Sequence, residues 1–155
     1  MKKNFIGVIL IVICFLTGCA ANPMVALYNN DKAIASDTNT YNLDAVEQKI
    51  NDGHFVANVE RMEGMDTVWE FDTEEDIDIN LIYKINVSSG KLKLVQINPK
   101  GYVSVITECD SNIQDTAETT LNVEKGNNRI KIVTDENTKF DIDLSIPEGD
   151  FKELG

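Results

Sequence analysis

The sequence predicts a mainly β protein, an antiparallel β-sandwich of the jelly-roll or immunoglobulin-like kind with one short N-terminal helix. Short segments that alternate apolar and polar residues recur between residues 56 and 146. Turn-forming Gly, Pro, Asn and Asp separate these segments, and no long helical period lies between them. About seven short strands at this spacing are typical of two packed antiparallel sheets.

The first residues resemble an export signal. Lys2 and Lys3 precede an apolar run from Phe5 to Leu16. A helix of that length spans roughly 18 Å, against about 30 Å for the hydrocarbon core of a bilayer. The run therefore fits the apolar region of a signal peptide, which we assign to residues 1–18.

The residues that follow are similar to the lipobox of bacterial lipoproteins, namely Leu16-Thr17-Gly18-Cys19. This resemblance implies cleavage between Gly18 and Cys19 and attachment of lipid, palmitate included, to the Cys19 thiol. Two or more acyl chains hold a protein stably on a membrane. We expect a lipid-anchored protein on the extracytoplasmic face of the cell membrane. The alternative is an uncleaved anchor with a chance cysteine.

Charge and cysteine content limit the classes of partner. The chain has 26 acidic and 14 basic residues, so loss of Lys2 and Lys3 would leave 12 basic residues and a net charge of −14. Such a surface excludes nucleic acid and repels anionic head groups. Cys14 would leave with the signal peptide and Cys19 would carry lipid. Cys109 then remains alone, and no intramolecular disulfide can form.

We expect residues 19–40 to form a flexible tether with a reach near 25 Å, and residues 41–155 to form one domain. The domain would begin with a short amphipathic helix, because Leu43, Val46 and Ile50 recur at helical spacing. Asn42 would cap this helix, and Gly53 would end it.

Strands are expected at residues 56–61, 77–87, 92–97, 102–108 and 119–123. Residues 98–101, Asn-Pro-Lys-Gly, would connect two of them as a hairpin turn. Residues 129–134 and 139–146 would form a final pair of strands. In that pair Arg129 and Lys131 would share the outer face with Asp141 and Asp143.

Two features are candidate binding sites. The acidic cluster between Asp72 and Asp78 could hold calcium, but it lacks the pattern of an EF-hand loop, so a solvated turn is favoured. Trp69 could stack on a sugar ring, as could Tyr102, but a buried Trp69 beside Phe71 is favoured. We predict no metal and no cofactor.

His54 and Cys109 were weighed as catalytic residues. His54 is the single histidine, and a surface position at the end of the expected helix is favoured over catalysis. Cys109 lies between Glu108 and Asp110, which disfavour its thiolate, so a structural or exposed thiol is favoured over intermolecular pairing. We therefore predict that the protein is not an enzyme.

Three segments resemble a domain of small lipoproteins of Firmicutes, clostridia especially. These segments are residues 65–72, 87–95 and 125–133. The strand order and the 98–101 turn are also similar to jelly-roll modules of secreted peptidases, which supports the fold. The first resemblance implies an envelope lipoprotein and supplies no functional residue. We predict a β-sandwich that binds a protein or glycan partner or has a structural role, with a carbohydrate-binding surface module as the alternative.

Overall fold

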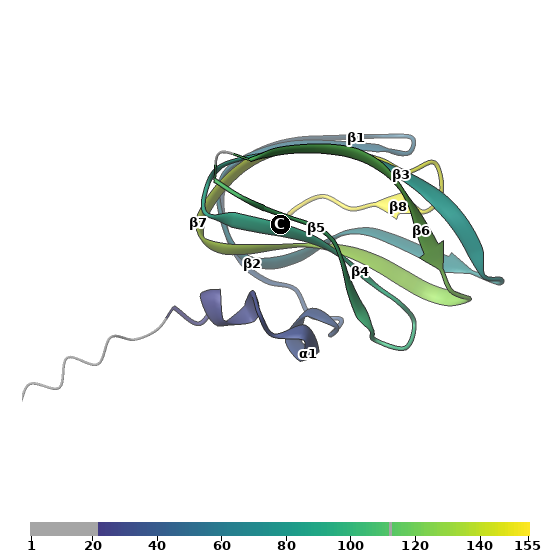
Figure 1. The fold of residues 1–155 in the computed structure, drawn as a ribbon. Coiled ribbons are helices and arrows are strands. Elements are labelled where there is room, and N and C mark those ends of the chain that lie inside the picture. The colour runs from purple at the N-terminus through teal and green to yellow at the C-terminus, as the bar shows by residue number, and fades with distance from the viewer. Residues whose placement is uncertain (1–21, 112) are drawn as a thin grey trace, which may run out of the picture.

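The computed structural model describes residues 22–111 and 113–155 as a mainly β protein (Figure 1). All strand pairings are antiparallel, which confirms the predicted fold class. The elements are η1 (Val25–Leu27), α1 (Asp31–Ile34), β1 (Thr40–Asn51), β2 (His54–Thr73), β3 (Ile77–Ser89), β4 (Lys91–Ile97), β5 (Val103–Asp110), β6 (Gln114–Val123), β7 (Gly126–Ser145) and β8 (Asp150–Phe151).

Predictions about the signal peptide and Cys19 lie outside the described residues. Within the described ranges, no helix combines the length and the apolar character needed to cross a bilayer.

Two strands of 20 residues, β2 and β7, pair along almost their whole length and belong to both layers of the sandwich. The first half of β2 and the second half of β7 lie between β1 and β3, with β6 beyond β3; we call this layer the upper sheet. The other halves of β2 and β7 join β8, β4 and β5 in the lower sheet.

The two long strands turn from one sheet to the other at the bend, which comprises residues 59–64 of β2 and 134–138 of β7. Register shifts between Val59 and Gly64 mark this region. Gly64 has a φ of +101°, and a Cβ there would lie 2.1 Å from the Thr40 carbonyl oxygen. Only glycine therefore fits where β1 crosses the bend. Figure 1 shows β7 turning between the layers.

The main core fills the space between the two sheets. Apolar side chains at alternate positions of both sheets meet there, among them Phe55, Leu81, Ile85, Leu94, Ile132, Phe140, Ile142 and Leu144. Because successive side chains of a strand point to opposite faces, each sheet also has an outer face.

The expected strands at residues 77–87, 92–97, 102–108 and 119–123 are confirmed as parts of β3, β4, β5 and β6. The 98–101 turn joins β4 and β5, which pair as the predicted hairpin. The expected strand at residues 56–61 is the first part of the much longer β2.

The prediction of a helix after Asn42 was wrong, since that segment is strand β1. Ala45 has a φ of +47°, and at this irregularity the inward-facing side chains change from Leu43 to Val46. The resulting spacing of three residues imitates a helical period. Gly53 does not end a helix, because it belongs to the turn between the paired residues Asn51 and His54.

The prediction of a flexible tether was also wrong for the described part of residues 19–40. This part lies below the lower sheet in Figure 1 and covers its outer face. Ile34 is fully buried and Tyr28 is 5% exposed, in a second cluster with Met65, Val95, Ile97 and Val133. The polar composition of this segment suggested a spacer. Its few apolar side chains nevertheless pack on the apolar outer face of the lower sheet.

The expected final pair of strands is one continuous strand, β7, which passes through the bend. Residues 129–134 therefore lie in the lower sheet, and residues 139–145 lie in the upper sheet. The sequence predicted that Arg129 and Lys131 share a face with Asp141 and Asp143. This prediction was wrong, because the two pairs lie in different sheets. Both cations are buried beneath the N-terminal segment instead.

Candidate functional site

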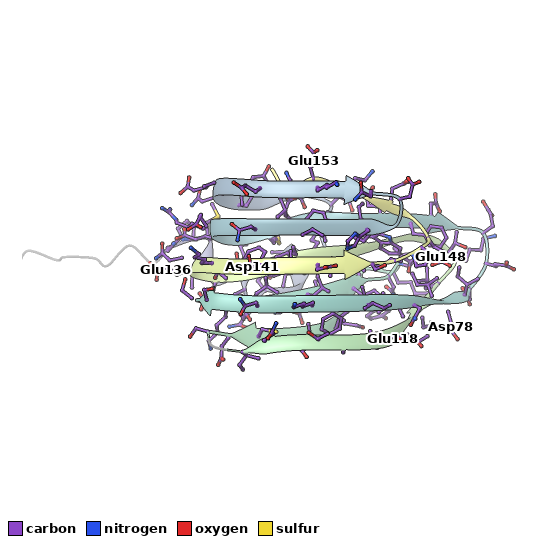
Figure 2. The ribbon with its side chains drawn as sticks, turned by 90° about the horizontal axis from the view of Figure 1, so that it is seen from above. Asp78, Glu118, Glu136, Asp141, Glu148 and Glu153 are labelled. Carbon is purple, nitrogen blue, oxygen red and sulfur yellow. The ribbon has the colours of Figure 1, made fainter. Side chains whose placement is uncertain are left out.

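The outer face of the upper sheet is uncovered and carries rows of polar side chains that cross its strands. One row takes a residue from each of five strands, in the order Glu47, Asn58, Asp141, Asn86 and Gln114. The adjoining row consists of Lys49, Val56, Asp143, Lys84 and Thr116. Figure 2 views this sheet from above and labels Asp141 on its central strand.

Most of these side chains line a groove of about 570 Å³ that spans β1, β2, β7, β3 and the start of β6. The lining contains three carboxylates, from Glu47, Asp141 and Asp143, and two ammonium groups, from Lys49 and Lys84. The groove is therefore almost balanced in charge, although the whole chain has a net charge of −12. Such a lining suits a polar ligand of low net charge.

Asp141 is the centre of the first row. The side-chain amides of Asn58 and Asn86 donate to its two carboxylate oxygens, Asn86 at 3.3 Å. These bonds orient both amides across the face of the sheet. Within the described part of the chain neither amide oxygen receives a hydrogen bond, so each can accept one from a ligand.

His54 lies beside the groove and not at a helix end. Its Nε2 is 2.7 Å from Oδ1 of Asp143, and both side chains are partly exposed on the outer face. A device of the Ser-His-Asp or Cys-His kind also needs a hydroxyl or thiol within hydrogen-bond reach of the ring. Among the described side chains, no hydroxyl or thiol is hydrogen-bonded to His54. This arrangement supplies a polar contact rather than an activated nucleophile.

The acidic cluster between Asp72 and Asp78 does not converge on a point. The Glu74 carboxylate pairs with the Lys125 ammonium group at 3.3 Å, and Asp76 accepts from the Lys125 backbone at 2.7 Å. Asp78 accepts from Asn122 on the neighbouring strand. The described residues include no group of three His, Cys, Asp or Glu side chains placed to hold a metal ion.

Trp69 is fully buried, as the favoured interpretation predicted, and cannot serve as a platform for a sugar. Its Nε1 donates to the Glu148 carbonyl at 2.8 Å, and its ring lies 5.9 Å from that of Phe71. Tyr102 is 69% exposed, but it follows the 98–101 turn and does not line the groove.

Cys109 is buried in the main core, on the inner face of β5. Burial raises the pKa of its thiol, and the nearby carboxylates of Asp115, Asp110 and Glu108 raise it further. A protonated, buried thiol is a structural group. The predicted structural role is thus the one that the geometry supports.

Sequence reasoning did not find the groove. The alternation of residues 77–87 placed Lys84 and Asn86 on a polar face, and a similar pattern placed Asp141 and Asp143 on one. It could not show that β7 lies between β2 and β3, which is what brings Asn58, Asp141 and Asn86 into one row. Only the order of the strands assembles the site.

No protein-family model matches the chain, and no curated protein matches it. Among solved structures, it is similar to a mutant family 29 carbohydrate-binding module complexed with mannohexaose, with 12% identity, a TM-score of 0.40, and coverage of 72% of this chain and 83% of that one. A family 6 carbohydrate-binding module from Cellvibrio mixtus lichenase 5A, in complex with cellotriose, has 11% identity, a TM-score of 0.38, and coverage of 68% and 88%. The antiparallel pairing of this chain's own strands defines its β-sandwich.

Proposed function

We propose that this protein is a non-catalytic lipoprotein, anchored to the extracytoplasmic face of a cell membrane through lipid on Cys19, whose upper groove binds a ligand. The observation that carries the binding role is the groove itself, an uncovered surface lined by polar side chains from five adjacent strands. The anchoring role is supported by the basic start, the short apolar run and the four residues that end at Cys19.

The groove is suited to binding rather than to bond cleavage. Its polar atoms come from strands, which hold side chains in fixed positions without a mobile lid. The amides of Asn58 and Asn86 present donors and acceptors side by side, next to the carboxylate of Asp141. Among the described residues, no Ser, Thr or Cys side chain is hydrogen-bonded to His54, so they do not form a Ser-His-Asp or Cys-His device there.

Metabolic labelling of the host with radioactive palmitate tests the anchor. We expect label on the protein and recovery in the membrane fraction, both lost in the Cys19→Ala variant. Cys14→Ala is the matched control, because it removes the other N-terminal cysteine and leaves the proposed lipid site intact. Unlabelled native protein, or a Cys19→Ala variant that stays equally membrane-bound, would disprove the anchor.

A more specific proposal is that the ligand of the groove is a saccharide. Neighbouring strands are about 4.8 Å apart, so the row from Glu47 to Gln114 places a polar side chain at each such interval. Carboxylates and amides at this spacing can bond successive hydroxyl groups of an extended sugar chain. Among the described residues, no aromatic side chain lines the groove, so binding would depend on hydrogen bonds.

Titration of the intact lipoprotein in detergent with a panel of soluble polysaccharides tests this candidate. We expect one class of polysaccharide to bind, and Asn86→Ala to weaken it about tenfold, as loss of a polar contact does. Asn122→Ala is the control, because Asn122 also bonds a carboxylate on this face but lies outside the groove. Equal weakening by both variants would reject the groove as the binding site, and no binding to the wild type would reject a saccharide.

A further inference from the structure

The N-terminal segment is a fixed layer of the molecule. Two cations of β7 hold it against the outer face of the lower sheet. Arg129 donates to the carbonyls of Ala35 and Ser36 at 2.8 and 3.1 Å, and Lys131 donates to those of Ser36 and Thr38 at 2.8 and 3.0 Å. These carbonyls follow the end of α1, where cations are favourable. The segment cannot swing away without exposing Ile34 and leaving both cations unpaired.

The beginning of this segment is attached to the bend. Nδ2 of Asn22 donates to Oε2 of Glu63 at 3.1 Å, and Glu63 also accepts from Asn42 and from the Asn137 backbone, each at 3.3 Å. Glu63 is buried, and the hydrogen bond from Asn22 is the largest of the contributions that lower its pKa. The first described residue is thus tied to one end of the sandwich.

Only Ala20 and Ala21 separate Asn22 from Cys19. Consecutive Cα atoms are 3.8 Å apart, so three steps span at most about 11 Å. A lipid on Cys19 would therefore lie much closer to the body than a tether of about twenty residues would allow, since such a tether reaches roughly 25 Å.

We infer that the bend is the membrane-facing end of this protein, held against the bilayer by the short link from Cys19 to Asn22. This inference rests on the proposed lipid anchor. Figure 2 shows Glu136 at the bend end and both Asp78 and Glu148 at the opposite end, with Asp141 between them. The partner of the bend is thus the surface of the bilayer that contains the anchor.

The orientation places the groove near the membrane. Asp141 is four residues beyond Asn137 along β7, which corresponds to roughly 14 Å in a strand. The first row of the groove runs across the strands and not toward the bend. A ligand bound at Asp141 would accordingly lie nearer to the lipid attachment point than the opposite end of the sandwich does, where Asp78 and Glu148 lie. The groove therefore suits ligands that come to the membrane surface.

Energy transfer to a dye-labelled lipid measures this orientation. Lipidated Glu136→Cys and Asp78→Cys proteins are purified from the host, labelled with a donor dye and placed in phosphatidylcholine vesicles that contain the acceptor. Cys19 would carry lipid and Cys109 is buried, so only the new thiol reacts. We expect transfer from position 136 to exceed that from position 78 by about twofold or more, given their different distances along the strands.

The control carries a flexible Gly-Ser insertion of about twenty residues between Ala21 and Asn22. It should lower transfer at position 136 and reduce the difference between the two positions. Equal transfer from both positions at native length would overturn the orientation and leave the anchor standing. Protein that carries no lipid and does not float with the vesicles would overturn the proposed anchor and the orientation together.

Discussion

The outer faces of the two sheets are built partly from the same strand, β7, but have opposite environments. In the lower sheet its outward residues Arg129 and Lys131 are buried beneath residues 22–39. In the upper sheet its outward residues Asp141 and Asp143 border an open groove. One face is therefore structural and the other is available to a ligand. The difference arises from a covering segment about 95 positions earlier in the sequence.

The largest expected effect is a difference in stability between matched substitutions on the covered face and on the open face. Ile34→Ala removes a fully buried side chain from the covered face and should lower the free energy of unfolding by about 2–5 kcal/mol. Ile82→Ala is the matched substitution on the open face, where Ile82 is 48% exposed, and should change it by less than about 0.5 kcal/mol. Urea unfolding of both variants measures the difference. Equal losses would show that residues 22–39 do not cover the lower sheet.

A second comparison uses two lysines. Lys131→Met leaves the Thr38 carbonyl without its donor and removes one of the two donors to the Ser36 carbonyl, so it should cost about 1–3 kcal/mol. Lys84→Met removes an exposed ammonium group from the groove and should be nearly neutral for stability. Thermal unfolding at pH 7 distinguishes them. A Lys131→Met variant as stable as the wild type would contradict the fixed attachment of the N-terminal segment.

Burial, and secondarily Arg129, lowers the pKa of Lys131 to about 8. A lysine in the unfolded chain titrates near pH 10.4. Between these values the unfolded chain binds the proton more than the folded one does, so Lys131 makes stability increase with pH, by at most about 1.4 kcal/mol per pH unit. A neutral amine retains two N–H groups for its two carbonyls.

The stability of the wild type relative to Lys131→Met should therefore rise between pH 8 and 10, as urea unfolding at several pH values would show. Tyr28 and Cys109 also titrate at high pH, but they are present in both proteins and cancel in the difference. A relative stability that is constant or falls over this interval would contradict a buried charge at Lys131.

The smallest expected effect on stability is in the groove. Asp141→Ala should change the free energy of unfolding by less than about 0.5 kcal/mol, because its partners Asn58, which is exposed, and Asn86, which is partly exposed, can bond water. Circular dichroism during thermal unfolding measures this. A loss comparable to that of Ile34→Ala would indicate that the open face has a structural role.

Local periodicity was enough to predict the β class and several strands. Residues 77–87 alternate regularly because β3 has a core face and a solvent face along its whole length. The hairpin around residues 98–101 was also predictable, since Pro and Gly occur where the turn requires them. These features depend on neighbours in sequence, and sequence shows neighbours directly.

The remaining features depend on distant partners. The alternation of residues 129–134 gave the outward positions of Arg129 and Lys131, but it could not show that Ser36 and Thr38 cover them. β1 was taken for a helix because the irregularity at Ala45 produces a helical spacing of apolar residues. The groove was missed because its first row takes one residue from each of five strands.

Amide hydrogen exchange at Ile34 and Ala35 tests most directly whether the N-terminal segment is part of the folded body. Their N–H groups donate to the carbonyls of Asn30 and Asp31 at 2.9 and 2.8 Å, above the buried apolar cluster. We predict that both amides exchange as slowly as Val133 beneath them, through opening of the whole sandwich. Rapid exchange at Ile34 and Ala35 while Val133 stays protected would contradict the covered face and the membrane orientation that depends on it.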